Sequence, residues 1–325
     1  MTTITYTICR VCGASESLSA FPAAERMFGN GEVFDYFQCG KCGTVQIAEV
    51  PDNLGYYYQS DSYYSFNNLR REQPLKALVK RVVAANIIGR PQRYPRGHGM
   101  IDRLRRGCQP WIATIPGLTL QSRILDVGCG EGARLDDLAR LGFTDLAGID
   151  MFLPETAVGT RPNGVRLMSG DLADHDGQYD LITMHHSLEH VPDPRALLVA
   201  ARERLAPGGS IFVRIPLLQP DIWSRFGVDW VQLDPPRHLY LFAPDAFRAY
   251  AASAGLGEVG SGTDTMGWSL AWSEAYRKGI PMVGVGGKPN PLPFTAEEMA
   301  RFEAEAEALN AADKGDQGYF VLQPA

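Results

Sequence analysis

The stretch that most constrains this chain runs from Ile124 to Gly132 and reads Ile-Leu-Asp-Val-Gly-Cys-Gly-Glu-Gly. A short apolar strand ends in the carboxylate of Asp126, and glycines at positions 128, 130 and 132 lead into a helical pattern over residues 133–141. A strand that feeds a helix through glycines brings bare backbone and a helix N-terminus up against a ligand. We therefore expect a ligand-binding turn here.

Two kinds of cofactor fit such a turn. Gly128, Gly130 and Ala133 satisfy the dinucleotide-binding pattern, and Asp150 follows about 20 residues later, as that pattern requires. Asp126 argues against a dinucleotide, because a carboxylate two residues before the first glycine would repel a pyrophosphate. The ammonium and sulfonium groups of S-adenosylmethionine (SAM) are positive and suit a carboxylate. The pattern favours SAM.

The bulk properties describe an ordinary globular protein. The chain has 325 residues, enough for a large and a small domain, with 45% hydrophobic and 21% charged residues. A net charge of −6 argues against a nucleic-acid partner, which usually needs a basic face. The N-terminal residues lack a signal-peptide pattern, and no apolar run approaches the roughly 20 residues of a membrane span. We expect a cytoplasmic protein.

Two cysteine pairs, each followed by glycine, predict a metal site. They are Cys9 with Cys12 and Cys39 with Cys42. Two thiolates three positions apart can face one tetrahedral ion, and disulfides are disfavoured in a reducing compartment. We expect a structural zinc ribbon, with iron as the alternative because ligand spacing does not select the metal. Cys108 and Cys129 are interpreted as packing residues.

The remaining pattern divides the chain into three parts: a zinc ribbon over 1–50, an aromatic and basic segment over 51–118, and an α/β domain over 119–325. The middle part holds tyrosines at 56–58 and 63–64, which fit either an apolar seam or a lid with a hydroxyl donor. Its basic residues between 70 and 106 fit either a solvated helix face or a phosphate-docking surface.

Residues from 122 onward alternate between strand and helix, as βαβ units require. We expect strands at 123–127, 146–149, 165–168, 181–184, 210–215, 256–261 and 319–322. Helices are predicted over 194–205, 244–254 and 296–309, with an insertion at about 263–317 that reads as a cap. The predicted fold class is α/β, with a Rossmann-like sheet that is parallel except for an antiparallel last strand.

With these elements placed, residues 120–262 resemble the class I SAM-dependent methyltransferases. The matching motifs are the glycine turn, Gly148-Ile-Asp150, Ser169-Gly-Asp171-Leu172, Tyr179-Asp180, Leu188-Glu-His190-Val-Pro-Asp193-Pro and Leu205-Ala-Pro-Gly-Gly209. The resemblance implies a set of cofactor contacts. They are Asp126, Gly128, Cys129 and Gly130 at the methionine end, Asp150 and Met151 at the ribose, Asp171 and Leu172 at the adenine, and His185 beside the cofactor.

The ribbon and a second motif extend the resemblance. Trp230-x-x-x-Asp234-Pro-Pro-Arg-His238-Leu-Tyr240 looks like bacterial sugar methyltransferases with an N-terminal zinc-binding domain. This implies a small-molecule substrate, a nucleotide- or phosphate-linked sugar, polysaccharide or glycoside. The C-methylating members carry a further C-terminal domain for which this chain is too short, which favours O-methylation.

A hydroxyl acceptor must lose a proton, and imidazole titrates near neutral pH. His190 and His238 are the candidate bases, since both follow strands at the edge where parallel sheets bind ligands. Glu189, His186 and Tyr240 are secondary candidates. The alternatives are C- or N-methylation of a small metabolite, an RNA methyltransferase that grips nucleic acid with its ribbon, and a non-catalytic SAM-binding protein.

Overall fold

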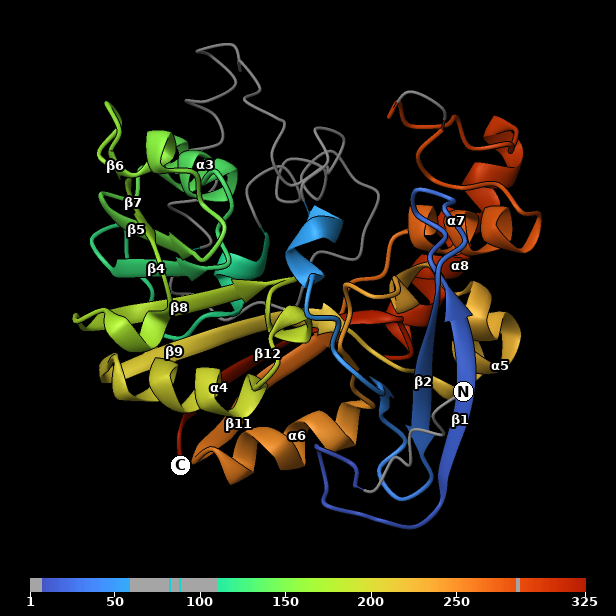
Figure 1. Cartoon of the computed structure of the whole chain (residues 1–325). Coiled ribbons are helices and arrows are strands. Elements are labelled where there is room, and N and C mark those ends of the chain that lie inside the picture. The colour runs from blue at the N-terminus through green and yellow to red at the C-terminus, as the bar shows by residue number, and fades with distance from the viewer. Residues whose placement is uncertain (1–7, 59–81, 83–87, 89–109, 285–286) are drawn as a thin grey trace.

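The computed structural model describes residues 8–58, 82, 88, 110–284 and 287–325. Two sheets organise this part of the chain, one of eight strands and one of four (Figure 1). The predictions about Tyr63, Tyr64, the basic residues between 70 and 106, and Cys108 lie outside the described residues.

The large sheet has the strand order β11-β12-β9-β8-β4-β5-β7-β6. Strands β9, β8, β4, β5 and β7 run parallel, while β12 pairs antiparallel with β9 and β11, and β6 antiparallel with β7. The bounds are β4 Arg123–Val127, β5 Asp145–Asp150, β6 Gly159–Thr160, β7 Arg166–Ser169, β8 Tyr179–His185, β9 Leu205–Pro216, β11 Leu256–Thr263 and β12 Gln317–Pro324. The predicted Rossmann-like fold class is confirmed.

Helices cover both faces of this sheet. Helix α3 (Ala133–Leu141) lies on one face, and α4 (Pro194–Glu203) and α6 (Pro244–Ser253) lie on the other (Figure 1). Asp193 begins α4 by accepting a hydrogen bond from the Ala196 amide at 2.9 Å. The prediction carried α4 to residue 205, but the helix ends at Glu203 because Leu205 begins β9 and pairs there with Tyr179 of β8.

Between β11 and β12 the chain forms α7 (Gly267–Arg277) and α8 (Ala296–Ala311), which pack together beside α5 (Pro220–Phe226). Thr295 and Glu298 form a capping box that starts α8. Short 3₁₀ turns make up the rest. They are η1 Leu54–Tyr58, η3 Pro110–Thr114, η4 Glu155–Ala157, η5 Leu172–Asp174, η6 Leu188–His190, η7 Gly227–Asp229 and η8 Val231–Leu233.

The small sheet joins the N-terminal segment to a loop of the α/β part. Its order is β1-β2-β3-β10, with β1 Leu18–Ala24, β2 Val33–Cys39, β3 Val45–Ile47 and β10 Tyr240–Leu241. The edge strand β10 is close to two hundred residues away in sequence from β3, with which it pairs antiparallel. The four-cysteine segment and the loop that carries His238 therefore share one sheet.

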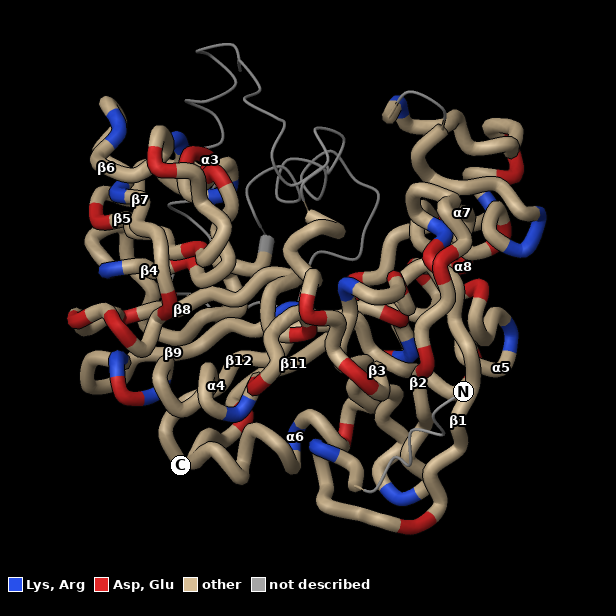
Figure 2. Tube along the Cα trace, viewed as in Figure 1, with Lys and Arg blue, Asp and Glu red and all other residues tan. Residues whose placement is uncertain are grey.

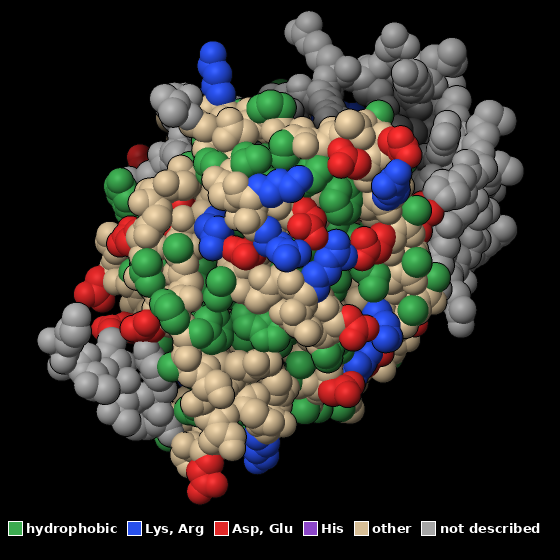
Figure 3. All heavy atoms as spheres, turned by 90° about the vertical axis from the view of Figure 1, so that its right-hand side faces the viewer, with side chains coloured by type: hydrophobic (Ala, Val, Ile, Leu, Met, Phe, Trp, Pro, Cys, Tyr) green, Lys and Arg blue, Asp and Glu red, His purple; other side chains and the backbone are tan. Residues whose placement is uncertain are grey.

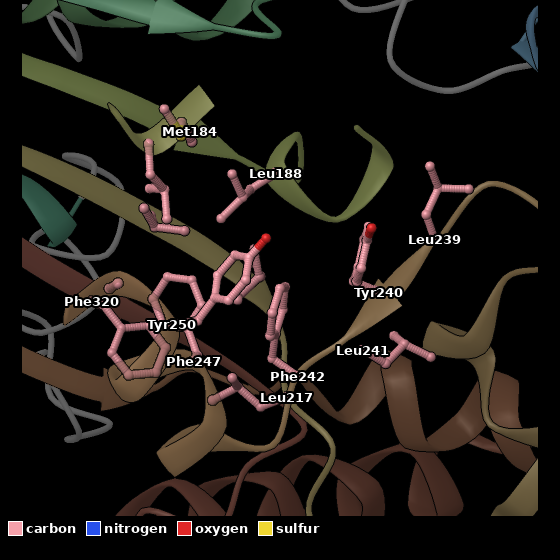
Figure 4. Packing of buried hydrophobic residues seen from close by; sticks show 14 of the residues in the cluster. Met184, Leu188, Leu217, Leu239, Tyr240, Leu241, Phe242, Phe247, Tyr250 and Phe320 are labelled. Carbon is pink, nitrogen blue, oxygen red and sulfur yellow. The ribbon is translucent and has the colours of Figure 1, made fainter. Parts of the chain in front are cut away.

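An aromatic cluster fixes the segment that follows His238 (Figure 4). The Phe242 ring stacks on Tyr240 at 5.7 Å and meets Phe247 and Tyr250 of α6, each at 5.4 Å between ring centroids. Phe247 in turn lies 4.5 Å from Phe320 of β12. Aromatic pairs at these separations contribute stability beyond that of the area they bury. They therefore anchor β10 to α6 and to strand β12 of the large sheet.

Acidic and basic residues are interspersed along most elements (Figure 2). The face over β1, α5 and α7 shows the same mixture, with blue and red side chains side by side (Figure 3). Arg225 is paired there with Glu274 at 3.0 Å, and Lys314 with Asp221 at 3.0 Å. These two cations on this face are therefore each balanced by an acidic partner. Among the described residues, no helix is long and apolar enough to cross a membrane.

Candidate functional site

The four predicted metal ligands come together at one end of the small sheet. The Sγ atoms of Cys9 and Cys42 lie 3.7 Å apart, as do those of Cys12 and Cys39, and all four lie within 4.8 Å of one another. A disulfide would need about 2.05 Å, whereas two thiolates on a tetrahedral zinc ion lie roughly 3.8 Å apart. The geometry therefore fits a metal ion and excludes disulfides between these pairs.

Glycines 128, 130 and 132 form the predicted turn after β4, all with positive φ. A Cβ at Gly128 would overlap the Cβ of Ser187, so the histidine-bearing loop after β8 packs directly on bare backbone. The Gly130 amide donates to Asp150 Oδ2 at 2.9 Å. The turn is thus tied to the end of β5, where the second predicted carboxylate stands.

Asp126 is almost fully buried at the end of β4. Its Oδ1 accepts a hydrogen bond from the Thr183 hydroxyl at 2.6 Å. Burial raises the pKa of Asp126, while the nearby Arg134 guanidinium and the Thr183 bond act to lower it. A buried carboxylate beside a glycine turn suits the positive methionine end of SAM, so these residues fit that donor.

The other predicted cofactor contacts follow neighbouring strands. Asp171 caps η5 by accepting from the Ala173 amide at 2.9 Å, and Leu172 is buried beneath it. Met151 is 64% exposed at the end of β5. His185 lies between Trp111 and Phe212, with ring centroids 4.9 and 5.0 Å away, and neither of its ring nitrogens has a hydrogen-bond partner.

His190 and His238, the two predicted bases, lie against each other with ring centroids 4.7 Å apart. They come from different loops, after β8 and after α5, and meet at Glu189, whose side chain is fully buried. Glu189 Oε1 lies 3.2 Å from His186 Nδ1 and 4.0 Å from His238 Nε2. Three imidazoles therefore surround one carboxylate beside the glycine turn.

Hydrogen bonds fix which ring nitrogen of each histidine carries the proton. A backbone carbonyl can only accept, so His238 Nδ1 donates to Gln232 O at 2.6 Å and His190 Nδ1 donates to Arg237 O at 2.9 Å. Arg214 can only donate, so His186 Nε2 accepts from it at 3.0 Å and Nδ1 donates to Glu189. The Nε2 lone pairs of His190 and His238 are left available.

Burial lowers the pKa values of two of the three imidazoles in this cluster. Burial, reinforced by His238, lowers the pKa of His190 to about 4, and burial also lowers the pKa of His186. Burial acts to raise the Glu189 pKa, but the hydrogen bond from His186 and the neighbouring imidazoles bring it down to about 2. At neutral pH the site is an ionised carboxylate among imidazoles, of which His186 and His190 are neutral.

Tyr58 connects the histidines with the cofactor edge. Its hydroxyl lies 2.9 Å from His190 Nδ1 and 3.3 Å from Arg237 O, and its ring stacks on Phe152 at 5.5 Å. Phe152 is two residues past Asp150. Tyr57, by contrast, is buried and donates to Glu32 at 2.8 Å. The position of Tyr58 therefore fits a lid residue with a hydroxyl donor, and that of Tyr57 fits a residue of an apolar packing seam.

Arg237 does not stand free as an anchor for a substrate phosphate. It is fully buried, with NH2 2.9 Å from Glu25 Oε1 and Nε 2.8 Å from Asp234 Oδ2. Two carboxylates already neutralise its charge. Glu25 and Tyr36, whose hydroxyl donates to His238 O at 2.9 Å, were missed in the sequence because their partners lie some two hundred residues away.

Glu189, His190 and His238 could also hold a cation. One ligand atom from each lies within 4.8 Å of the others. Each histidine donates its Nδ1 proton to a backbone carbonyl, which is the usual orientation of metal-ligating imidazoles. Glu189 Oε2 is buried without a hydrogen-bond partner. Among the described residues, this cluster and the four cysteines are the two groups that could bind a metal ion.

The parallel sheet, the glycine turn with its carboxylates and the motif order define a class I SAM-dependent methyltransferase domain, and the chain carries one. Residues 100–259 match the family model of a methyltransferase domain. The ubiquinone biosynthesis O-methyltransferase of Cronobacter sakazakii is 36% identical over 121 residues, covering 34% of this chain and 48% of that protein. That of Escherichia fergusonii is also 36% identical over 121 residues, at 34% and 49% coverage. The chain therefore spans about half the length of these curated relatives.

Two solved structures are also similar. A SAM-dependent methyltransferase from Archaeoglobus fulgidus is 17% identical, covering 69% of this chain and 94% of that chain, with a TM-score of 0.43. Geranyl diphosphate C-methyltransferase from Streptomyces coelicolor A3(2) is 12% identical, covering 78% of this chain and all of its own, with a TM-score of 0.46.

We predict that Gly128→Ala weakens SAM binding at least tenfold and lowers the free energy of unfolding by about 1–3 kcal/mol, since the new Cβ overlaps Ser187. Gly117→Ala is the matched control, because Gly117 also has a positive φ but open space around it. Calorimetry of SAM binding and thermal unfolding measure both effects. Equal effects of the two variants would contradict the close approach of the loop.

We predict that the four cysteines hold one metal ion per chain and that Cys42→Ser loses it. Three thiolates and a hydroxyl bind zinc more weakly than four thiolates. Cys129→Ala serves as the control, because Cys129 lies in the glycine turn and not in the cluster. Elemental analysis of the purified proteins gives the metal content, and unchanged content in Cys42→Ser would refute the assignment.

Proposed function

We propose that this protein transfers the methyl group of SAM to a hydroxyl of a sugar, carried by a nucleotide, a polysaccharide or a glycoside. The observation that carries the proposal is the pair of imidazoles, His190 and His238, with free Nε2 atoms beside the glycine turn. Zinc is the proposed ion of the four cysteines, and the cytoplasm is the proposed compartment, because the thiols are unbridged.

The donor supplies a methyl group already activated by its sulfonium, so the protein's work is alignment and proton removal. The acceptor oxygen forms a bond to the methyl carbon as the carbon–sulfur bond breaks, and the sulfur keeps that electron pair. The hydroxyl proton passes to Nε2 of His238. The ionised Glu189, 4.0 Å from that nitrogen, stabilises the resulting imidazolium.

His238 is preferred to His190 as the base. A pKa of about 4 makes His190 a weak proton acceptor at neutral pH, whereas general bases work best near the operating pH. His190 lies beside the His238 ring and contacts Tyr58, so in this proposal it contacts the acceptor. Tyr58 in turn stacks on Phe152, two residues past Asp150, which supports an acceptor position near the donor's ribose end.

Two further observations support oxygen as the methylated atom and a sugar as the acceptor. The relatives that match residues of this domain are named as O-methyltransferases. The four-cysteine segment and the Trp230-to-His238 motif resemble sugar methyltransferases with a zinc-binding domain. Two residues of this motif are fixed by buried polar contacts, because Trp230 Nε1 donates to Asp316 at 2.8 Å and Asp234 accepts a hydrogen bond from Arg237.

The acceptor class is tested by incubating the protein with methyl-labelled SAM and separate pools of nucleotide-sugars, other small metabolites and RNA. We expect label in the nucleotide-sugar pool, in a form stable to mild base and lost on ether cleavage. Label on carbon or nitrogen, or in RNA alone, would overturn the proposed acceptor while leaving methyl transfer intact.

We predict that His238→Ala lowers kcat about 10²- to 10⁴-fold, because proton transfer in the transition state contributes that much. The affinity for SAM should stay within about twofold, since His238 is not part of the glycine turn. Added imidazole should restore part of the rate by filling the vacated space. An unchanged kcat in His238→Ala would show that this histidine is not the base.

A cation at Glu189, His190 and His238 is a second candidate mechanism, favoured by the unpartnered Glu189 Oε2. Such an ion would lower the pKa of a bound hydroxyl directly and take over the base's role. It would require two metal ions per chain in the active protein, one of them lost in His238→Ala. Under imidazole catalysis the active protein holds only the ion of the four cysteines, so metal content measured with activity separates the two mechanisms.

A further inference from the structure

The small sheet, which lies next to the four cysteines, contacts His238 directly and is connected to His190 through Arg237 and Tyr240. We propose that this sheet positions the histidines, with Tyr36 as a positioning residue for His238, so that metal binding at the cysteines controls methyl transfer. This inference rests on the proposed function, because it assigns the metal a part in the same reaction.

The first contact is backbone pairing. Strand β10 pairs with β3 so that Tyr240 lies opposite Gln46, and the Ile47 amide donates to Leu239 O at 3.1 Å. His238 directly precedes this paired segment. A strand of two residues has no stability of its own, since isolated pairs of strands are marginal in water. The place of His238 therefore depends on β3.

Gln46 connects that pairing to the metal site. Its Nε2 donates to Cys9 Sγ at 2.9 Å, and its Oε1 accepts from the Arg10 amide at 3.1 Å. The Gln46 side chain is fully buried. Hydrogen bonds to a ligating sulfur orient the ligand and are set by the metal in turn. A change at the cysteines thus reaches the β3–β10 pair through one side chain.

Tyr36 makes the second contact, from strand β2. Its side chain is fully buried, and its hydroxyl donates to the His238 carbonyl at 2.9 Å. The side chain of His238 is held separately, because its Nδ1 donates a hydrogen bond to Gln232 O. The imidazole of His238 is consequently oriented through its ring by one loop and through its backbone by the cysteine sheet.

Two more contacts lead to His190. The Tyr240 hydroxyl donates to Pro192 O at 2.8 Å while the Arg10 guanidinium lies 5.0 Å above its ring. Glu25 holds the buried Arg237, whose carbonyl accepts the Nδ1 proton of His190. Both loops that meet at Glu189 are therefore fastened to the same N-terminal sheet, and a shift of about 1 Å there is enough to cost two orders of magnitude in rate.

The first test uses Tyr36→Phe, which removes only the hydroxyl bonded to His238 O. We expect kcat to fall about 10- to 100-fold while the affinity for SAM and the metal content stay unchanged. Tyr57→Phe is the matched control, because it removes another buried tyrosine hydroxyl from the N-terminal part without touching either histidine. A kcat for Tyr36→Phe equal to that of the control would overturn the positioning role.

The second test does not depend on activity. Amide hydrogen exchange is compared between the metal-loaded protein and the protein stripped by a chelator. We expect exchange to rise at least tenfold over 188–192 and 234–241 and to stay constant in β5, which lies in the large sheet. Unchanged exchange over both loops would refute the coupling even in a protein that transfers methyl groups.

The outcomes remain separable from those of the proposed function. If no acceptor takes up label, the proposed reaction fails, yet the exchange experiment still decides the coupling. If removal of the metal unfolds the whole chain, Tyr36→Phe with its metal in place decides instead. In that variant, faster exchange confined to the His238 loop supports the proposal, and an unchanged loop overturns it.

Discussion

The buried guanidinium of Arg237 is the contact on which the rest of the site depends. Burial opposes its charge, but Asp234 and Glu25 raise the pKa of Arg237 well above its usual range. Losing one partner of such a buried pair typically costs about 3–5 kcal/mol, because a charge is left without compensation. The arrangement fastens three separate segments to one point: the turn after β1, the loop before β10 and, through the Arg237 carbonyl, His190.

Burial lowers the pKa values of His186 and His190, so these two histidines remain uncharged at neutral pH. The Arg237 guanidinium is hydrogen-bonded to two carboxylates. The Arg214 guanidinium donates to Asp264 at 2.6 Å and to the neutral His186. Glu189 is the ionised carboxylate that contacts His186 and lies 4.0 Å from His238. The ionised Glu189 lies beside the neutral His186 and His190. Such a site suits a reaction in which the substrate hydroxyl loses a proton and the sulfonium of the donor loses its positive charge.

Most features that rest on a local pattern could be predicted from the sequence. The glycine turn, the acids that end β4 and β5 and the parallel strands follow from alternation, turn residues and motif order, and the cysteine spacing foretold a cluster with the distances of a metal site. His190 and His238 could be chosen by their place after strands, but their contact could not, because it depends on two loops folding onto one carboxylate. The pairing of β10 with β3 gave no signal at all, since two residues carry no periodicity. The helix α4 was predicted two residues too long, because the pairing of Leu205 with Tyr179 of the parallel neighbour β8 draws Leu205 into β9.

The sharing of β10 between the two sheets has a consequence for how such proteins diversify. A domain that contributes only its own strands can be exchanged between enzymes as a unit. Here the small sheet is completed by residues from the middle of the other domain, so a new N-terminal segment must arrive together with a compatible His238 loop. Inheritance of the two as a single block, with sequence changes in one matched by changes in the other, is the expected evolutionary signature of this architecture.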